Sequence, residues 1–138
     1  MLLSGMLRHS VPEVSVQQVV SHLKGTILLD AREPIEFSVS HINGALSVGY
    51  EHFDLNKWLY LPKNSPIVVY CSVGYRSEKI SEHLLAAGFI NVSNLYGGIF
   101  EWVNEGLLVV DASGATNRVH AYNAAWGIWL NKGEKVYE

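Results

Sequence analysis

The sequence predicts an α/β domain built on a mainly parallel sheet, and three observations support this class. Short apolar runs alternate with segments of helical spacing along the 138 residues, as in strands that are joined through helices. The length fits a single domain, since a domain takes roughly 100–200 residues. Hydrophobic residues make up 49% of the chain, so a core can form without metals or disulfides.

In the first half of the chain, local signals mark where helices and strands begin. Ser15 suits the N-cap of a helix whose valines share one face. The apolar run Thr26–Asp30 ends in a charge and is typical of a buried strand. Pro34 fits the first turn of a short helix, where an N–H is not needed. The expected elements are, in order, a helix over 15–24, a strand over 26–30, a short helix from Pro34, a strand over 45–48 and a helix over 51–60.

The second half repeats the alternation around the strongest strand of the sequence, Ile67–Tyr70. A polar loop from Cys71 to Arg76 follows this strand. Ligands bind beyond the carboxyl ends of the strands in such sheets, so this loop is the first candidate for chemistry. The remaining expected elements are a helix over 77–87 that Gly88 ends, a strand over 91–95 and a helix that starts after Gly97-Gly98 and reaches Val103.

Composition narrows the function classes. Lys and Arg total 10 against 13 Asp and Glu, so the net charge is −3 with neutral histidines. The absence of a basic excess predicts no nucleic-acid partner. No apolar run approaches the ~18 residues that a membrane span needs, and the opening residues lack the pattern of a signal peptide. We therefore expect a soluble, cytoplasmic protein without a membrane partner.

A single cysteine, Cys71, excludes an internal disulfide and a multi-cysteine zinc site.

The loop that begins at Cys71 combines a nucleophile with features that favour its anionic form. An ordinary thiol with a pKa near 8.5 is only about 3% thiolate at pH 7. A helix N-terminus stabilises an anion by about 0.3–1 kcal/mol, so loop amides and the charge of Arg76 are expected to supply the rest. Gly74 lets the chain turn so that successive N–H groups face one centre. The residues expected to form this binding loop are Ser72, Val73, Gly74, Tyr75 and Ser77.

Structural interpretations compete with this functional one. A lone cysteine is often a small buried hydrophobic residue. Cys71, however, follows a strand and precedes a Gly-Tyr-Arg-Ser turn, which favours a functional role. Arg76 is either a surface residue that pairs with Glu78 or Glu82, or a charge beside the sulfur. Its place at the end of the loop favours the second interpretation.

The order of the motifs resembles the rhodanese-like family of single-domain sulfurtransferases. The resemblance covers about residues 12–106 and implies a three-layer domain, with helices on both sides of the sheet and residues 107–138 as a C-terminal extension. Five motifs in register carry it: Asp30-Ala31-Arg32-Glu33-Pro34 with Glu36-Phe37; His41-Ile42-Asn43-Gly44-Ala45; Cys71, Gly74, Arg76 and Ser77; Leu84, Gly88 and Phe89; and Leu95, Gly97, Gly98, Ile99 and Trp102.

The resemblance also implies a reaction, with Cys71 and Arg76 as the catalytic residues. The Cys71 thiolate attacks the outer sulfur of a donor such as thiosulfate and becomes a persulfide. The sulfur then passes to a small acceptor, cyanide or a thiol, or to an acceptor protein. Ser72 stands where many relatives have a basic residue, so the loop is less positive and thiosulfate is expected to be a poor physiological donor. Neither a metal nor a cofactor is expected.

Two alternatives remain open beside this reaction. The domain is either a catalyst or a module that carries persulfide sulfur, or binds a partner, without turnover. A phosphatase is the other alternative. The loop encloses four residues between Cys71 and Arg76, one fewer than in the phosphatases that share the general fold. A shorter loop makes a tighter cradle, so we expect little phosphatase activity.

Four further residues are expected to support the site structurally: Asp30, Arg32, Glu36 and His41. Asp30 and Arg32 end the strand beside the loop. We expect a structural ion pair there, in which Arg32 meets Glu36 or Glu33, and its loss should harm stability more than chemistry. His41 is also expected to be structural, because an attacking thiolate does not need a general base.

The extension 107–138 contains an aromatic segment, 121–130, that predicts a short helix. We expect this helix to pack back on the domain, and the alternative is a dimer contact or a part of the rim of the site. Its expected apolar stripe is Tyr122, Ala125, Trp126, Trp129 and Leu130.

Overall fold

The computed structural model describes residues 7–137 and confirms the predicted α/β class. Its centre is a five-stranded sheet with the order β1-β5-β4-β2-β3, in which every pair is parallel. The most central strand, β4, pairs with β2 over four positions and with β5 over three. The strands are β1 (Glu13–Val14), β2 (Ile27–Asp30), β3 (Leu46–Ser47), β4 (Ile67–Tyr70) and β5 (Val92–Leu95).

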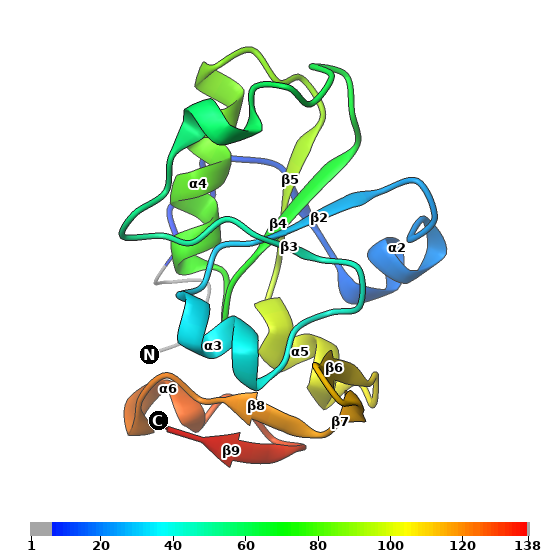
Figure 1. The fold of residues 1–138 in the computed structure, drawn as a ribbon, viewed down its shortest axis with the longest axis vertical. Coiled ribbons are helices and arrows are strands. Elements are labelled where there is room, and N and C mark those ends of the chain that lie inside the picture. Colours follow the sequence, from blue (N-terminus) through cyan, green and yellow to red (C-terminus); the bar gives the residue numbers. More distant parts are fainter. Residues whose placement is uncertain (1–6, 138) are drawn as a thin grey trace.

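Helices cover both faces of this sheet (Figure 1). Alternate residues of β4 divide between the two core layers: Val68 packs with α2 and α5, whereas Val69 packs with α4 and the 3-10 helix η1. This alternation follows from the two-residue period of a strand. The helices of the domain are α2 (Val16–Ser21), α3 (Pro34–Val39), η1 (Leu55–Trp58), α4 (Tyr75–Ala86) and α5 (Gly98–Asn104).

Two helices differ from their expected bounds for local reasons. Helix α2 ends at Ser21 instead of residue 24, because the side chains of Ser21 and His22 bond to carbonyls one turn back and compete with further backbone bonds. The helix expected over 51–60 is only the short η1.

Helix α4 begins two residues earlier than expected. Gly74 is its N-cap, with φ at +122°, and the Gly74 carbonyl accepts the N–H of Glu78 at 3.1 Å. Such a φ suits glycine, because an L side chain would be strained there. As a result, Tyr75 and Arg76 belong to the first turn of the helix, and Arg76 has a fixed direction.

The C-terminal extension adds structure that the sequence patterns did not indicate. A hairpin of β6 (Val109–Asp111) and β7 (Gly114–Thr116) precedes two parallel strands, β8 (Arg118–His120) and β9 (Glu134–Val136). The helix expected over 121–130 is the single turn α6 (Ala124–Gly127). This unit lies at one end of the domain (Figure 1).

Residues of the extension enter the main core. Val119 and Leu130 are 0% and 1% exposed and belong to the cluster under α2 and α5, against which Trp126 and Trp129 also pack. Residues 1–6, on which the signal-peptide expectation rests, and the side chain of Ala125 lie outside the described residues. Within residues 7–137, no helix has both the length and the apolar character that a membrane crossing demands.

Candidate active site

Cys71 lies directly after β4, at the carboxyl edge of the sheet, and its thiol is completely buried. The backbone turns back over it: the Gly74 N–H points at Sγ over a nitrogen–sulfur distance of 3.1 Å. The Cys71 carbonyl accepts the N–H of Ile99 at 2.9 Å, which fixes the loop on α5. The sulfur therefore lies in an apolar layer but receives a backbone dipole aimed at it.

A second polar group reaches the sulfur from α4. Ser77 Oγ is 3.4 Å from Cys71 Sγ and 2.6 Å from Asn94 Oδ1. Asn94 in turn donates through Nδ2 to the Gly74 carbonyl at 3.0 Å. A hydroxyl has one proton, so Ser77 donates either to the Asn94 amide oxygen or to the sulfur. Asn94 thus holds both the loop and the hydroxyl that faces Cys71.

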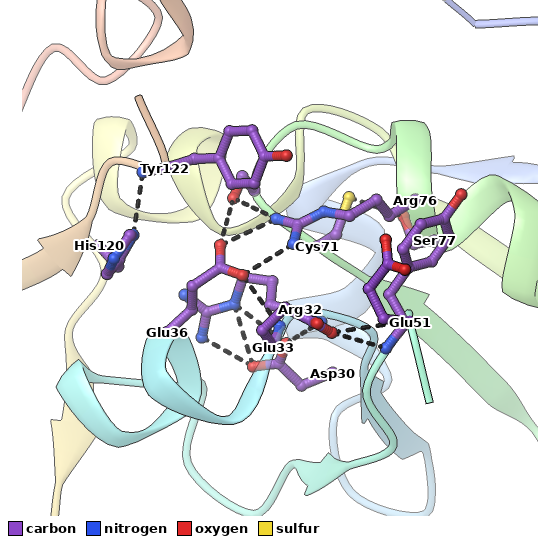
Figure 2. Close-up of polar contacts among 12 residues, drawn as sticks. Asp30, Arg32, Glu33, Glu36, Glu51, Cys71, Arg76, Ser77, His120 and Tyr122 are labelled. Atoms are coloured by element: carbon purple, nitrogen blue, oxygen red, sulfur yellow. Dashed lines mark hydrogen bonds and ion pairs between the residues drawn. The ribbon is translucent and has the colours of Figure 1, made fainter. Parts of the chain in front are cut away.

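Arg76 does not pair with Glu78 or Glu82; it forms a buried ion pair with Glu36 of α3. Nη1 and Nη2 lie 2.7 and 2.9 Å from the two carboxylate oxygens, and Nη2 also donates to Ser72 Oγ at 3.0 Å. Figure 2 shows the guanidinium reaching towards Glu36 beneath the Tyr122 ring. Burial alone would raise the pKa of Glu36, but the hydrogen bond and charge of Arg76 outweigh it and lower that pKa.

Arg76 keeps one unused donor near the reactive loop. Its Nε has no hydrogen-bond partner among the described residues, although the residue is only 4% exposed. Burial would lower the pKa of Arg76, whereas Glu36 and the nearby Cys71 raise it. The cation is therefore held by one carboxylate and lies within electrostatic reach of the sulfur.

The structural ion pair of Arg32 has a different partner from the one expected. Arg32 meets Asp30, not Glu36 or Glu33: Nη2 and Nε lie 2.7 and 3.0 Å from the Asp30 carboxylate oxygens, and both residues are 0% exposed. The Arg32 backbone N–H also donates to Asp30. The tight turn after β2 brings these two side chains together, while Glu36 is already occupied by Arg76.

His41 lies two residues beyond Val39, the last residue of α3. Its ring stacks on Phe37 at 3.8 Å, and Nδ1 contacts the Phe37 carbonyl at 3.0 Å. Its backbone pairs with Val110 of β6. These contacts connect α3 with the hairpin and are consistent with the structural role that we expect.

A pocket of about 300 Å³ opens beside the loop. Of the five residues expected to form the binding loop, Tyr75 alone is among its lining residues, together with the expected catalytic residue Arg76. Ser72 is committed to Arg76, and Val73 is 1% exposed in the core. Two aromatic residues of the extension complete the wall, so the extension contributes to the rim as well as to the core. The lining residues are Glu33, Tyr50, Glu51, Tyr75, Arg76, Tyr122 and Trp126.

The two aromatic residues of the extension form a stacked pair over Arg76. The Tyr122 and Trp126 rings are 4.4 Å apart, and the Arg76 guanidinium carbon lies 4.7 and 5.8 Å from their centres. Tyr122 has a positive φ of +70°, and its N–H donates to His120 Nδ1 at 3.0 Å. A non-glycine residue in this backbone region is uncommon, so the surrounding contacts hold Tyr122 in place.

Sequence reasoning missed Asn94 as a site residue. The available signal was an amide side chain in the predicted strand that contains β5, at a position that the sheet buries. Such a group must find hydrogen-bond partners. Within residues 7–137, no group of three or more His, Cys, Asp or Glu side chains is arranged to hold a metal ion.

Comparison with protein families and curated relatives identifies what the chain is similar to. A model of the rhodanese-like domain matches residues 15–105. A tRNA uridine(34) hydroxylase of Aster yellows witches'-broom phytoplasma is 39% identical over 84 residues, which cover 57% of this chain and 27% of that protein. The protein of the same name from Staphylococcus haemolyticus is 42% identical over 79 residues, covering 54% and 25%. The chain thus spans about a quarter of the length of these relatives.

Solved structures share the fold. A rhodanese-related protein of Thermoplasma volcanium superposes with a TM-score of 0.65 and 28% identity, over 72% of this chain and 97% of that one. The thiosulfate sulfurtransferase of Pseudomonas aeruginosa superposes with a TM-score of 0.66 and 25% identity, over 87% of this chain and 23% of that one.

Proposed function

The chain belongs to the rhodanese-like domain family, and we propose on this basis that it is a sulfurtransferase that works through a persulfide on Cys71. The observation that supports this most is the Gly74 N–H directed at the buried sulfur at 3.1 Å. An anionic sulfur in an apolar layer requires such donors. The same donor can stabilise the thiolate and, after loading, the persulfide.

The reaction is an exchange at a sulfur–sulfur bond. The Cys71 thiolate attacks the outer sulfur of thiosulfate, that sulfur–sulfur bond breaks, and sulfite leaves with the electron pair. A nucleophile then attacks the outer sulfur of the persulfide and returns the electron pair to Cys71. With cyanide the product is thiocyanate; with a thiol it is the persulfide of that thiol.

Arg76 is proposed to act on the loaded state. Its two terminal nitrogens are occupied by Glu36, and its free Nε is the remaining donor for the additional negative sulfur. Arg76 also lines the pocket that opens beside the loop. Since Cys71 has no exposed surface, a local opening of the loop precedes attack.

A phosphatase reaction has less support. A phosphoryl group has three oxygens, and the loop donors available for them are few, because Ser72 Oγ and two Arg76 nitrogens are already paired within the site.

The reducing compartment that keeps a thiol free is the cytoplasm, where we propose that the protein works.

The named relatives support a second candidate function. Proteins that are 39% and 42% identical to this chain over the matched part carry the name tRNA uridine(34) hydroxylase. In this second candidate function, the domain would serve the modification of tRNA. The net charge of −3 argues against RNA binding by the domain itself, and that exclusion stays a prediction. Retardation of purified tRNA on a gel, weakened by salt, would favour the second candidate.

The primary test compares the wild type with Cys71→Ser. After incubation with thiosulfate, the intact mass of the wild type should rise by one sulfur atom, and Cys71→Ser should not gain it. Adding cyanide should then give repeated thiocyanate formation if the domain is a catalyst, and a single discharge if it is a carrier. A wild-type protein that gains no sulfur from thiosulfate or from inorganic polysulfide would contradict the proposed chemistry.

A further inference from the structure

We infer that the acceptor for the Cys71 sulfur is a cationic thiol, an aminothiol with a primary ammonium group. The inference rests on the proposed sulfurtransferase function and concerns the substrate class of the same site. It follows from the charges and rings that line the pocket beside the loop, which Arg76 also lines and through which we propose that the acceptor approaches.

Two carboxylates stand on one wall of this pocket. Glu33 is held in place, because one of its oxygens accepts the backbone N–H groups of Tyr50 and Glu51 at 3.1 and 3.3 Å. Glu51 is exposed and lines the same pocket. Figure 2 shows both carboxylates on the same side of the site. Both carboxylates therefore contribute negative charge to the lining of the pocket.

The guanidinium that lines the pocket has its own carboxylate partner. Arg76 is neutralised by the bidentate pair with Glu36. Lys79, whose Nζ lies 5.6 Å from the Tyr75 ring centre, lines a neighbouring pocket. Glu33 and Glu51 therefore add negative charge to the entrance. Burial raises the pKa of Tyr50, nearby Tyr75 and Glu51 raise it further, and Arg76 opposes this rise.

Aromatic rings form the rest of the wall and suit a cation. Tyr50, Tyr75, Tyr122 and Trp126 all line the pocket. Rings of this kind attract ammonium groups within about 6 Å through their negative faces. Tyr122 and Trp126 already hold the Arg76 guanidinium on one side. Rings together with carboxylates favour a positive ligand over a neutral or negative one of equal size.

The transfer step is balanced without a further reactant. The aminothiol loses its thiol proton to solvent, and its sulfur anion attacks the outer sulfur of the Cys71 persulfide. The bond between the two sulfurs of the persulfide breaks, and its electron pair returns to Cys71. The product is the aminothiol persulfide, with the ammonium group left beside the carboxylates.

The test uses the whole chain loaded with inorganic polysulfide and checked by mass. Discharge is then followed in single turnover with three thiols of similar size and different charge: 2-aminoethanethiol, 2-mercaptoethanol and mercaptoacetate. Each rate is divided by the thiolate concentration. Glu51→Gln is compared with the wild type, and Glu105→Gln, at a glutamate that lines a different pocket, is the matched control.

We expect 2-aminoethanethiol to discharge the wild type about three to ten times faster than mercaptoacetate. A nearby carboxylate that solvent partly screens produces a rate difference of this size, because it attracts the ammonium group and repels the carboxylate of mercaptoacetate. The ratio should fall about threefold in Glu51→Gln, and Glu105→Gln should keep the wild-type ratio. Equal rates for the three thiols, or the same ratio in Glu51→Gln, would overturn the inference alone. Failure of the wild type to load sulfur would overturn the proposed function as well.

Discussion

Arg76 and Glu36, forty positions apart in the sequence, form a buried bidentate ion pair that joins the cysteine loop to α3. The guanidinium is 4% and the carboxylate residue 2% exposed. The pair fixes Arg76 and leaves its Nε without a hydrogen-bond partner among the described residues. A residue that family resemblance marks as catalytic is therefore also a structural connection between two elements.

Removal of one member of this pair should lower the stability of the folded protein. Glu36→Leu leaves a buried, unpaired guanidinium, so the free energy of unfolding should fall by about 3–5 kcal/mol in urea titrations. The double variant Glu36→Leu/Arg76→Met has no unpaired charge and should recover part of that loss. A double variant less stable than Glu36→Leu would show that the pair does not act as a unit.

The Asp30–Arg32 pair should affect stability and leave the chemistry intact. Arg32→Met leaves the buried Asp30 carboxylate without its partner, so the free energy of unfolding should drop by about 3–5 kcal/mol. Sulfur loading per folded molecule, measured by mass at low temperature, should stay near that of the wild type. A folded Arg32→Met protein that no longer loads sulfur would instead place Arg32 in the reaction.

The cysteine loop should not tolerate a side chain at Gly98. A Cβ there would lie 2.5 Å from the Ser72 carbonyl oxygen and against that of Cys71, and φ is +61°. Gly98→Ala should thus displace the loop and abolish sulfur loading. Gly106→Ala is the control, because its φ is also positive but no described heavy atom lies within 4 Å of its Cβ. It should cost only about 1–2 kcal/mol of stability and retain loading.

The Ser77 hydroxyl should support the reactivity of Cys71. Ser77→Ala removes the group 3.4 Å from the sulfur, and a hydrogen bond to a charged group is worth about 1.5–3 kcal/mol. Sulfur is a weak acceptor, so we expect the rate of persulfide formation to fall about tenfold. Ser81→Ala is the matched control on the same helix, since Ser81 Oγ is buried without a described hydrogen-bond partner. An equal loss in both variants would indicate general damage to α4.

His120 should make stability depend on pH. Burial, opposed by Glu36 and assisted by Arg32 and Arg76, lowers the pKa of His120 from 6.5. The unfolded chain then binds more protons, so stability is complete above about pH 6.5 and falls as the pH drops towards the folded pKa. Thermal unfolding between pH 7.5 and 5.5 should show a fall in Tm, and His120→Asn should reduce that fall. If Tm falls equally with pH in His120→Asn, another group causes the pH dependence.

Local sequence signals determined the parallel α/β fold and the place of Cys71. The capping serine at Ser15, the apolar run of β4 and the glycine at position 74 act within a few residues, so their effects are readable from the chain. The motif order also identified the family, which the match over residues 15–105 confirms.

Only the tertiary structure decided which side chains meet. Arg76 pairs with Glu36, Asn94 holds Ser77, and Tyr122 covers Arg76, and each of these pairs joins two different parts of the fold. Buried polar groups must be satisfied, but several carboxylates were available to each arginine in the sequence. The packing of α3, β5 and the extension against one loop determined which groups pair, because only that packing sets the distances between them.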